Sequence, residues 1–381
     1  MKFIVNSQQL LKQLQSLGGV LSPNNTMPII ACYHFRLEEG KLTVKTTDLS
    51  TTLVSTISVE TPHMDNPQEV AIPSKMLLDV MKTFDDVPVT FNVDESNYSI
   101  SLQSGEGEYS LAGMDAETFP TMPVAEVTGR VTMNASALID AIGKTLFATS
   151  NDDMHPQMSG IFCEMTPDGV TFVATDAHKL VRYRRKDTVC EESTNFILPK
   201  KPINVVRNIL AGRKEDCEVV IEYNSTNLFI SFDNFYIVCR LVDGRYPNYE
   251  AAIPKDNPRK LVIDRQTFLN TLRRVSIFAS EATRQVRLSL TETMMVISAE
   301  DHEFSNSAHE SIPCQYEGEP MDIGFNAKFL TEMISNLDTE QILIEMSHPS
   351  RAGIIFPYSD NPDEEKSEDI LMLVMPVMLA N

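Results

Sequence analysis

The stretch Phe3-Ile4-Val5-Asn6, followed by Gln8–Leu17, predicts a short strand that runs directly into a helix. Leucine recurs at helical spacing in the second part, and Asn6 stands where an N-cap residue belongs. The pattern returns twice, at Val131-Thr132-Met133-Asn134 with Ala135–Phe147 and at Leu261-Val262-Ile263-Asp264 with Arg265–Phe278. The corresponding capping residues follow Asn6 by 128 and 258 positions, which indicates a unit that occurs three times.

A second strand-to-helix pattern falls later in each unit. It joins Ala71–Lys75 to Met76–Phe84, Ile197–Lys201 to Ile203–Leu210, and Ile323–Lys328 to Phe329–Leu337. Pro73, Pro199 and Phe325 stand 126 residues apart in turn, and proline suits the start of a helix. Alternating β-branched runs lie between the helices, at Lys41–Asp48, Val170–Asp176 and Met294–Asp301, and they predict antiparallel strands.

The predicted fold is therefore α+β, with three tandem copies of a domain in which two helices pack on antiparallel sheets. We place the domains at residues 1–125, 128–254 and 255–381. The boundaries fall in the proline-bearing stretches Pro120–Val127 and Pro254–Pro258.

Composition excludes several classes of protein. No apolar run approaches the roughly 18 residues of a membrane span, and the polar start of the chain lacks the core of a signal peptide, so we expect a cytoplasmic protein. The six cysteines are scattered and form no C-x-x-C pair, so we expect reduced thiols and no metal site. There is no phosphate loop and no H-x-x-x-H spacing, and we predict no cofactor.

Charge is spread unevenly along the chain, whose net charge is -21. The six predicted helices carry 13 Lys and Arg but only 4 of the 53 acidic residues. Solvated amphipathic faces usually carry both signs, so they explain the basic residues but not the missing acids. We predict instead that the helices face the phosphates of duplex DNA, without reading its sequence. The predicted DNA-facing residues are Lys12, Lys75, Lys82, Lys144, Lys200, Lys201, Arg207, Arg213, Lys214 and Arg273.

Domain size limits the assembly. A domain of this length, treated as a sphere, has a diameter of roughly 36 Å. Four such spheres in a ring leave a hole of about 15 Å, and six leave about 36 Å, enough for a duplex of roughly 20 Å. A three-domain chain that encircles DNA is therefore predicted to be a homodimer with head-to-tail contacts.

The most site-like cluster is Asp176-Ala177-His178-Lys179. In a catalytic interpretation, Asp176 would orient His178 as the general base of a hydrolase. No nucleophile motif accompanies the two residues. Asp48 and Asp301 end similar strands, which favours a structural turn at Asp176. Two alternatives to a DNA ring remain, a hydrolase and a DNA-independent protein-interaction scaffold of the same fold.

Three segments carry a family resemblance: Leu241–Tyr249 (LVDGRYPNY) followed by Ile253-Pro254, Ala174–Leu180 (ATDAHKL), and Val374–Leu379 (VMPVML). In this order, on a threefold repeat, they resemble the bacterial replicative sliding clamps, the beta subunits of DNA polymerase III. The resemblance covers essentially the whole chain. It implies a non-catalytic ring of two protomers that encircles DNA and tethers the replicative polymerase, which confers processivity. Opening the ring is expected to need a separate ATP-driven loader, since this chain has no nucleotide site.

The resemblance also implies a hydrophobic cleft between the second and third domains, which receives a short peptide motif from the replicative polymerase, the clamp loader, other polymerases and repair proteins. The matching positions are Met158, Thr175, Ala177, His178, Lys179, Leu180, Pro247, Ala251, Ala252, Leu373, Val374, Met375, Pro376, Val377, Met378 and Leu379. A Met-rich apolar surface suits varied peptide side chains. Taken alone, Val374–Leu379 would instead be interpreted as a terminal edge strand.

The implied subunit contact places Tyr109 and Leu111 opposite Ile277 and Phe278. Lys75 and Arg274 lie nearby.

The chain departs from the family pattern at several positions. Ala177 replaces a usual glycine and Met378 a usual arginine, which affects the expected peptide preference. The loop residues Asn24, Pro156 and Gln157 stand where the family has DNA-touching side chains, so the helices become the expected contact. We further predict a hairpin turn at Ser104–Glu108 and a solvated loop at Asp360–Asp369.

Overall fold

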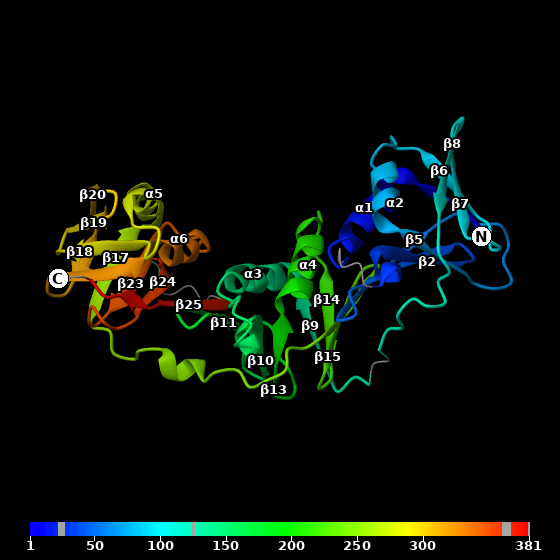
Figure 1. The fold of residues 1–381 in the computed structure, drawn as a ribbon. Coiled ribbons are helices and arrows are strands. Elements are labelled where there is room, and N and C mark those ends of the chain that lie inside the picture. Colours follow the sequence, from blue (N-terminus) through cyan, green and yellow to red (C-terminus); the bar gives the residue numbers. More distant parts are fainter. Residues whose placement is uncertain (22–26, 124–125, 360–366, 380–381) are drawn as a thin grey trace. The chain divides into compact units, whose positions relative to one another are not determined.

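The computed structural model describes residues 1–21, 27–123, 126–359 and 367–379 (Figure 1). They form two compact units, one of Met1–Leu138 with Lys201–Leu241 and one of Ile139–Lys200 with Val242–Asn381. The bounds of the three predicted domains remain a prediction, because these units divide the chain inside its second repeat. The reason lies in the sheets, which run from one repeat into the next.

Each repeat has the same order of elements, apart from two short extra strands in the third. The first repeat contains β1 (Lys2–Asn6), α1 (Ser7–Leu17), η1 (Pro28–Ala31), β2 (Cys32–Glu38), β3 (Lys41–Thr47), β4 (Thr51–Ser58), β5 (Gln68–Pro73), α2 (Ser74–Met81), β6 (Pro88–Val93), β7 (Ser99–Ser104) and β8 (Gly107–Ala112). The second contains β9 (Gly129–Asn134), α3 (Ala135–Leu146), η2 (Pro156–Met158), β10 (Gly160–Thr166), β11 (Gly169–Thr175), β12 (Lys179–Arg185), β13 (Thr194–Pro199), α4 (Lys200–Ala211), β14 (Glu218–Tyr223), β15 (Asn227–Phe232) and β16 (Phe235–Arg240).

The third repeat follows the helical turn η3 (Tyr249–Ala252) and ends in a short tail strand. It contains β17 (Arg259–Asp264), α5 (Arg265–Val275), η4 (Ser276–Phe278), β18 (Gln285–Leu290), β19 (Met294–Asp301), β20 (Asn306–Pro313), β21 (Gln315–Glu317), β22 (Met321–Asn326), α6 (Ala327–Ser335), β23 (Gln341–Met346), β24 (Gly353–Tyr358), β25 (Glu368–Val374) and β26 (Pro376–Val377).

Every repeat builds two antiparallel ladders of four strands. The first ladder joins the opening strand to the last three strands, in the order β1-β6-β7-β8 in repeat one, β9-β14-β15-β16 in repeat two and β17-β23-β24-β25 in repeat three. The second ladder joins the four middle strands, in the orders β5-β2-β3-β4, β13-β10-β11-β12 and β22-β18-β19-β20. The predicted α+β repeat of two helices and antiparallel sheets is confirmed.

Two strand pairings fuse ladders of neighbouring repeats into continuous sheets. β4 of repeat one pairs antiparallel with β16 of repeat two, which makes one sheet of eight strands. β12 of repeat two pairs in the same way with β25 of repeat three, within a sheet of nine strands. Among the described residues, β8 and β20 each have a neighbour on one side only.

The helices follow from capping and amphipathic spacing. The side chain of Asn6 accepts a hydrogen bond from the Gln9 N–H at 2.9 Å, and Asp264 accepts one from Thr267 N–H at 2.7 Å, as predicted. Leu10, Leu14 and Leu17 of α1 are fully buried against the sheets. Helices α1 and α2 pack on each other, and so do α5 and α6, which Figure 1 shows for each pair.

Some predicted bounds change in detail. The helix predicted to run to Phe84 ends at Met81, and the one predicted to Leu337 ends at Ser335. Glu368 and Asp369 belong to β25, so the end of the predicted loop Asp360–Asp369 is strand, and residues 360–366 lie outside the described part of the chain. The hairpin turn is confirmed, since Ser104 pairs with Gly107 across two turn residues.

Candidate functional site

The turn between β11 and β12 is the structural turn that the repeat predicts. Asp176 Oδ1 accepts hydrogen bonds from the N–H groups of His178 at 3.0 Å and Lys179 at 2.9 Å. Asp48 Oδ1 closes the corresponding turn of repeat one through Ser50 and Thr51. Ala177 has a φ of 72°, in the left-handed region that glycine enters more easily. The glycine usual at this position is therefore explained by backbone geometry.

The side chain of Lys179 is buried next to this turn. Its side chain is only 6% exposed, and its Nζ lies 3.2 Å from Asp176 Oδ2 and 2.9 Å from Glu332 Oε2 of α6. The same Nζ lies 4.7 Å from the centre of the Phe329 ring. Lys179 thus ties the turn of repeat two to a helix of repeat three.

The catalytic interpretation of Asp176 and His178 finds no support in this geometry. The imidazole of His178 stacks on Phe329, with ring centres 6.1 Å apart. The carboxylate of Asp176 is occupied by two backbone N–H groups and by Lys179. In a triad-type site a carboxylate orients the histidine ring, and no hydrogen bond from Asp176 to the His178 ring is found among the described residues.

The C-terminal segment lies beside the turn and is bonded to it. The N–H of Met375 donates to the carbonyl of His178 at 2.8 Å. The strand β26 then pairs with β22, Val377 opposite Gly324 and Pro376 opposite Phe325. A Cβ at position 324 would lie 2.5 Å from the Val377 carbonyl oxygen, so only glycine permits this close approach. Met375 and Met378 remain 42% and 73% exposed.

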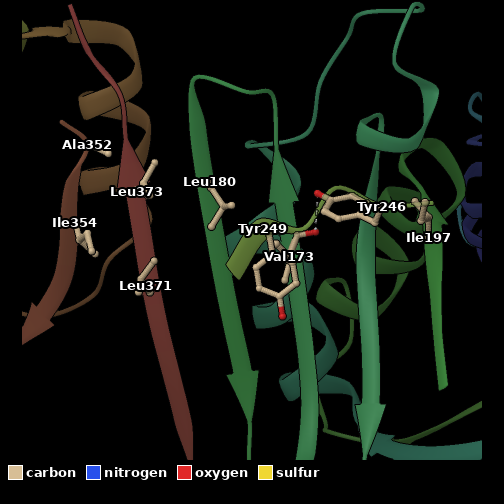
Figure 2. Close-up of a cluster of buried hydrophobic side chains, with 9 residues drawn as sticks. All are labelled: Val173, Leu180, Ile197, Tyr246, Tyr249, Ala352, Ile354, Leu371 and Leu373. Atoms are coloured by element: carbon tan, nitrogen blue, oxygen red, sulfur yellow. Dashed lines mark hydrogen bonds between the residues drawn. The ribbon is translucent and has the colours of Figure 1, made fainter. Parts of the chain in front are cut away.

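A buried apolar cluster supports the turn and the tail from below. Figure 2 shows Leu180 of β12 together with Leu371 and Leu373 of β25, on the strands that join repeats two and three. Leu180 and Leu373 are directly paired in the ladder. The same cluster contains Tyr246 and Tyr249, which lie beside Val173 of β11 in the figure.

The segment Tyr246–Tyr249 is fixed by specific contacts. The Tyr246 ring stacks on Phe162 with centres 4.6 Å apart, and its hydroxyl donates to the Val173 carbonyl at 3.4 Å. The Tyr249 hydroxyl donates to the Glu164 carboxylate. Burial raises the pKa of both phenols, so both stay protonated donors at neutral pH. This anchoring leaves Pro247, Ala251 and Ala252 exposed at the surface.

The predicted cleft residues thus divide into a supporting layer and a surface layer, all within the second compact unit. The buried members are Met158, Thr175, Lys179, Leu180, Leu373 and Val374. The exposed or half-buried members are Ala177, His178, Pro247, Ala251, Ala252, Met375, Pro376, Val377, Met378 and Leu379. Sequence reasoning missed Phe329 and Glu332, which hold His178 and Lys179. In the sequence, these two residues are marked only by lying in the second helix of the repeat, and that position does not indicate which side chains they contact.

Several predicted DNA-facing residues are engaged within the fold. Lys144 is 14% exposed, and its Nζ lies 3.2 Å from Glu368 and 3.6 Å from Asp338. Lys201 pairs with Asp48 at 2.7 Å, and Arg213 forms an ion pair with Asp233. These charges are largely neutralised where they stand, which weakens the expectation that they meet phosphate.

Other predicted basic residues keep more of their charge available. Within the described part of the chain, no ion-pair partner is found for Lys12, Lys75, Arg207 or Lys214. Lys200 and Arg273 donate to the neutral side chains of Asn151 and Ser335. Lys82 has a carboxylate at 3.6 Å, on Asp79 of its own helix. Asn24 lies outside the described residues. Pro156 and Gln157 are the first two residues of the short helix η2.

The residues predicted for a subunit contact lie on the edge strand β8 and in the helical turn η4, which packs beside the edge strand β20. Tyr109 and Leu111 are on β8, where Tyr109 is 43% exposed and packs edge-on against Phe84. Ile277 and Phe278 form η4 and are 77% and 40% exposed. Arg274 binds Glu310 of β20. Sequence reasoning missed β20 itself as the strand that borders this contact.

The described residues contain no cluster of three or more His, Cys, Asp or Glu that is placed to hold a metal ion. Six cysteines are present, and all are free thiols. No helix in the described ranges is long and apolar enough to cross a membrane.

Comparison with known proteins gives one consistent result. Family models of the DNA polymerase III beta subunit match in order, the N-terminal domain at residues 1–123, the central domain at 132–248 and the C-terminal domain at 250–375. Proteins named beta sliding clamp from Synechococcus elongatus and Pseudomonas putida are 26% and 28% identical over the full length of both chains. A crystallised sliding clamp from Pseudomonas aeruginosa, bound to griselimycin, matches all of both chains with a TM-score of 0.91 and 27% identity.

Proposed function

Because the chain belongs to the family of DNA polymerase III beta subunits, it is a sliding clamp that gives this polymerase its processivity, and we propose which of its surfaces close the ring, face DNA and bind partners. Such a clamp works by enclosure. Contacts with phosphates let it slide, and a tethered polymerase stays at high effective concentration near the primer end. We further propose that the chain itself is not an enzyme and acts in the cytoplasm.

The observation that carries the proposed closure is the repeated strand pairing. β4 pairs with β16, and β12 pairs with β25. In repeat three, β20 of the second ladder holds the place of β4 and β12. In repeat one, β8 of the first ladder holds the place of β16 and β25. Among the described strands, neither has the corresponding partner. We propose that β20 of one copy pairs with β8 of a second copy, twice per ring.

The pairings of β4 with β16 and of β12 with β25, here called the internal junctions, give the same register for this contact. Thr52 lies opposite Val238 at one junction, and Leu180 lies opposite Leu373 at the other. In the third repeat, Ser307 is equivalent to Thr52 and Leu180, because it pairs with the residue just before the turn aspartate. In β8, Ser110 is equivalent to Val238 and Leu373. Ser307 is therefore proposed to lie opposite Ser110 of the second copy.

The helix-facing side of the proposed contact is apolar. The equivalent pairs at the internal junctions are Leu53 with Ile237 and Val181 with Met372, and all four side chains are essentially inaccessible. At the subunit contact this position pairs Ala308 with Tyr109 of the second copy. A small residue opposite a large one accommodates the Tyr109 ring, which supports its role in the interface together with Leu111, Ile277 and Phe278.

An ion pair of the first junction supports a role for Lys75. Lys201, at the start of α4, pairs with the turn aspartate Asp48 at 2.7 Å. Lys75 holds the same place in α2, and Asp301 is the equivalent turn aspartate of repeat three. We propose that Lys75 pairs with Asp301 of the second copy rather than with DNA.

The DNA-facing surface is proposed to consist of the predicted basic residues whose charge is not paired with a carboxylate of another element. These are Lys12, Lys82, Lys200, Arg207, Lys214 and Arg273. Their support is the shortage of acidic residues in the helices, since an acidic exterior repels phosphate while the helices attract it.

The surface over the Tyr246 and Leu373 cluster is proposed to bind peptide motifs of the polymerase, the clamp loader, other polymerases and repair proteins. Met375, whose N–H donates to the His178 carbonyl, and Met378 are exposed. Ala251 and Ala252 are exposed beside the buried Tyr249 of the same cluster. Flexible methionines on a rigid support suit a surface that accepts varied apolar side chains.

Retention on DNA of two shapes tests enclosure directly. With a clamp loader and ATP supplied, the protein is expected to stay on nicked circles at high salt and to slide off once the circles are cut open. Equal loss from both shapes would mean binding by surface charge alone. No retention on either shape would favour the alternative, a DNA-independent scaffold of the same fold.

A further inference from the structure

The junction of repeats two and three carries an ion pair on the face turned away from the helices. Arg182 of β12 donates to Asp369 of β25 at 3.3 Å and to Glu250 at 3.2 Å. Arg182 is directly opposite Leu371, two residues beyond Asp369. A cation on the second ladder thus reaches an acid on the first ladder across the junction.

The proposed register places charged residues at the same positions of the subunit contact. His309 of β20 is equivalent to Arg182, since it lies two residues after Ser307 as Arg182 lies two after Leu180. Glu108 of the second copy is then opposite His309, in the position of Leu371. By residue count, Glu106 of the second copy stands at the position of Asp369, in the hairpin turn directly before β8. One histidine therefore faces two carboxylates where the internal junction has an arginine and an aspartate.

The side chains on each strand point the right way for this contact. Glu310 faces α5, because its carboxylate binds Arg274 and accepts from Thr271. His309, the next residue along the strand, therefore points to the opposite face. On β8, Tyr109 contacts Phe84 beside the helices, and Glu108 binds Ser101 on the other face at 3.1 Å. His309, Glu106 and Glu108 are all exposed in the single chain.

We propose that His309, when protonated, pairs with Glu106 and Glu108 of the second copy, so that the ring closes more tightly in mildly acidic than in mildly alkaline solution. The proposal rests on the proposed strand pairing. A histidine that binds its proton more strongly in the dimer stabilises the dimer below its titration and releases it above, and histidine titrates near pH 6.5.

The other charges around His309 do not cancel this effect. Ser298 of β19 is directly opposite it, and Glu300 lies on the diagonal. Arg287 of β18 is one strand further away, opposite Ser298. Arg274 of α5 is on the helix-facing side and is already paired with Glu310. On His309's own face the adjacent strand therefore offers Glu300, which lies 3.6 Å from His302, and the cation Arg287 is one strand further.

Sedimentation equilibrium of the full chain at pH 6 and pH 8, at one ionic strength, tests the proposal. We expect the dimer Kd of the wild type to be about tenfold larger at pH 8, since each ring has two such contacts and exposed pairs are individually weak. His309→Gln is expected to remove most of this difference. His309→Lys is expected to keep the dimer tight at both values.

His63→Gln is the matched control, because His63 is 79% exposed, far along the chain from β20, and also pairs with a carboxylate. It is expected to retain the wild-type difference, including any general effect of pH on a chain with many acids. If His309→Gln also retains that difference, the proposal is wrong. If no variant dimerises at either pH, the strand pairing itself fails, which is a separate outcome.

Discussion

Lys179 shows at the residue scale how the proposed peptide-binding surface is held in place. It lies almost buried between Asp176, Glu332 and the Phe329 ring. Removing one partner from such a group leaves the other charges poorly solvated, which costs more than an exposed pair contributes. Its role is therefore to position the turn that carries His178, rather than to contact a peptide through its charge.

Lys179→Ala is expected to lower stability by about 2 kcal/mol, because two half-buried carboxylates lose their cation. Urea unfolding followed by circular dichroism measures this loss. Lys328→Ala serves as control, because Lys328 is 56% exposed and lies 3.8 Å from the same Glu332. Equal effects of the two changes would contradict the assigned role of Lys179.

Glu368 gives a pH-dependent prediction. Burial alone would raise its pKa, but the hydrogen bond from Tyr183 and the charge of Lys144 outweigh burial and hold the pKa below its usual range. A lowered pKa means that the stabilisation is complete above the unfolded-state value of about 4.3 and is lost as the pH falls through the folded-state value. Glu368→Gln is therefore expected to be about 1 kcal/mol less stable than the wild type at pH 7. The difference between their urea midpoints should shrink towards pH 3, and a constant difference would refute the linkage.

What the sequence could predict about single residues depended on local signals. The turn at Asp176 and the caps at Asn6 and Asp264 follow from short-range patterns, and the structure confirms them. The partners of Lys179 and Lys144 come from strands and helices far along the chain, and nothing in a local pattern points to them. For that reason Lys144 was predicted to face DNA, although Glu368 and Asp338 surround its charge.

At the scale of elements, the strand-to-helix pattern predicted six helices at their places, because capping and apolar periodicity act within one turn. It did not predict that sheets continue across repeats. The pairing of β4 with β16 joins residues about 180 positions apart in the chain. Such pairing depends on which edges are left open after each ladder forms, and this becomes visible only in the assembled structure.

A pair of cysteines tests the proposed register of β20 on β8. Ser110→Cys combined with Ser307→Cys is expected to give two disulfides per ring under mild oxidation, since directly opposite residues have Cβ atoms within about 5.5 Å. Non-reducing electrophoresis detects the linked dimer. Cys32 and Cys239 interfere little, because burial raises the pKa of Cys32 to about 11 and that of Cys239 to about 12.

Ser110→Cys with His309→Cys is the register control, displaced by two residues on the same face. Faster linkage in this variant than in the first would mean that the register is shifted. Linkage in neither, while the protein remains a dimer, would mean that other surfaces join the two copies.

At the scale of the whole molecule, the acidic chain must still admit DNA. Lys12→Glu with Arg207→Glu is expected to slow loading on DNA by about tenfold and to reduce its salt dependence, because phosphate contacts are lost at two positions in each copy. Rings that have been loaded should nevertheless remain on closed circles, since enclosure does not depend on affinity. Lys255→Glu with Lys260→Glu, two exposed residues outside the helices, makes the same change in net charge. Equal slowing by both pairs would show that total charge matters and not the helix surface.

The open strands β8 and β20 have a consequence for the assembly of separate copies. The proposed contact joins two different edges, so it is head-to-tail, and a contact of this kind can add copies without limit. Whether it ends in a closed ring depends on the rotation from one repeat to the next. A substitution that changes the twist at an internal junction would therefore not merely loosen the dimer. It would convert closed rings into growing filaments, which would appear as concentration-dependent light scattering with the subunit contact fully intact.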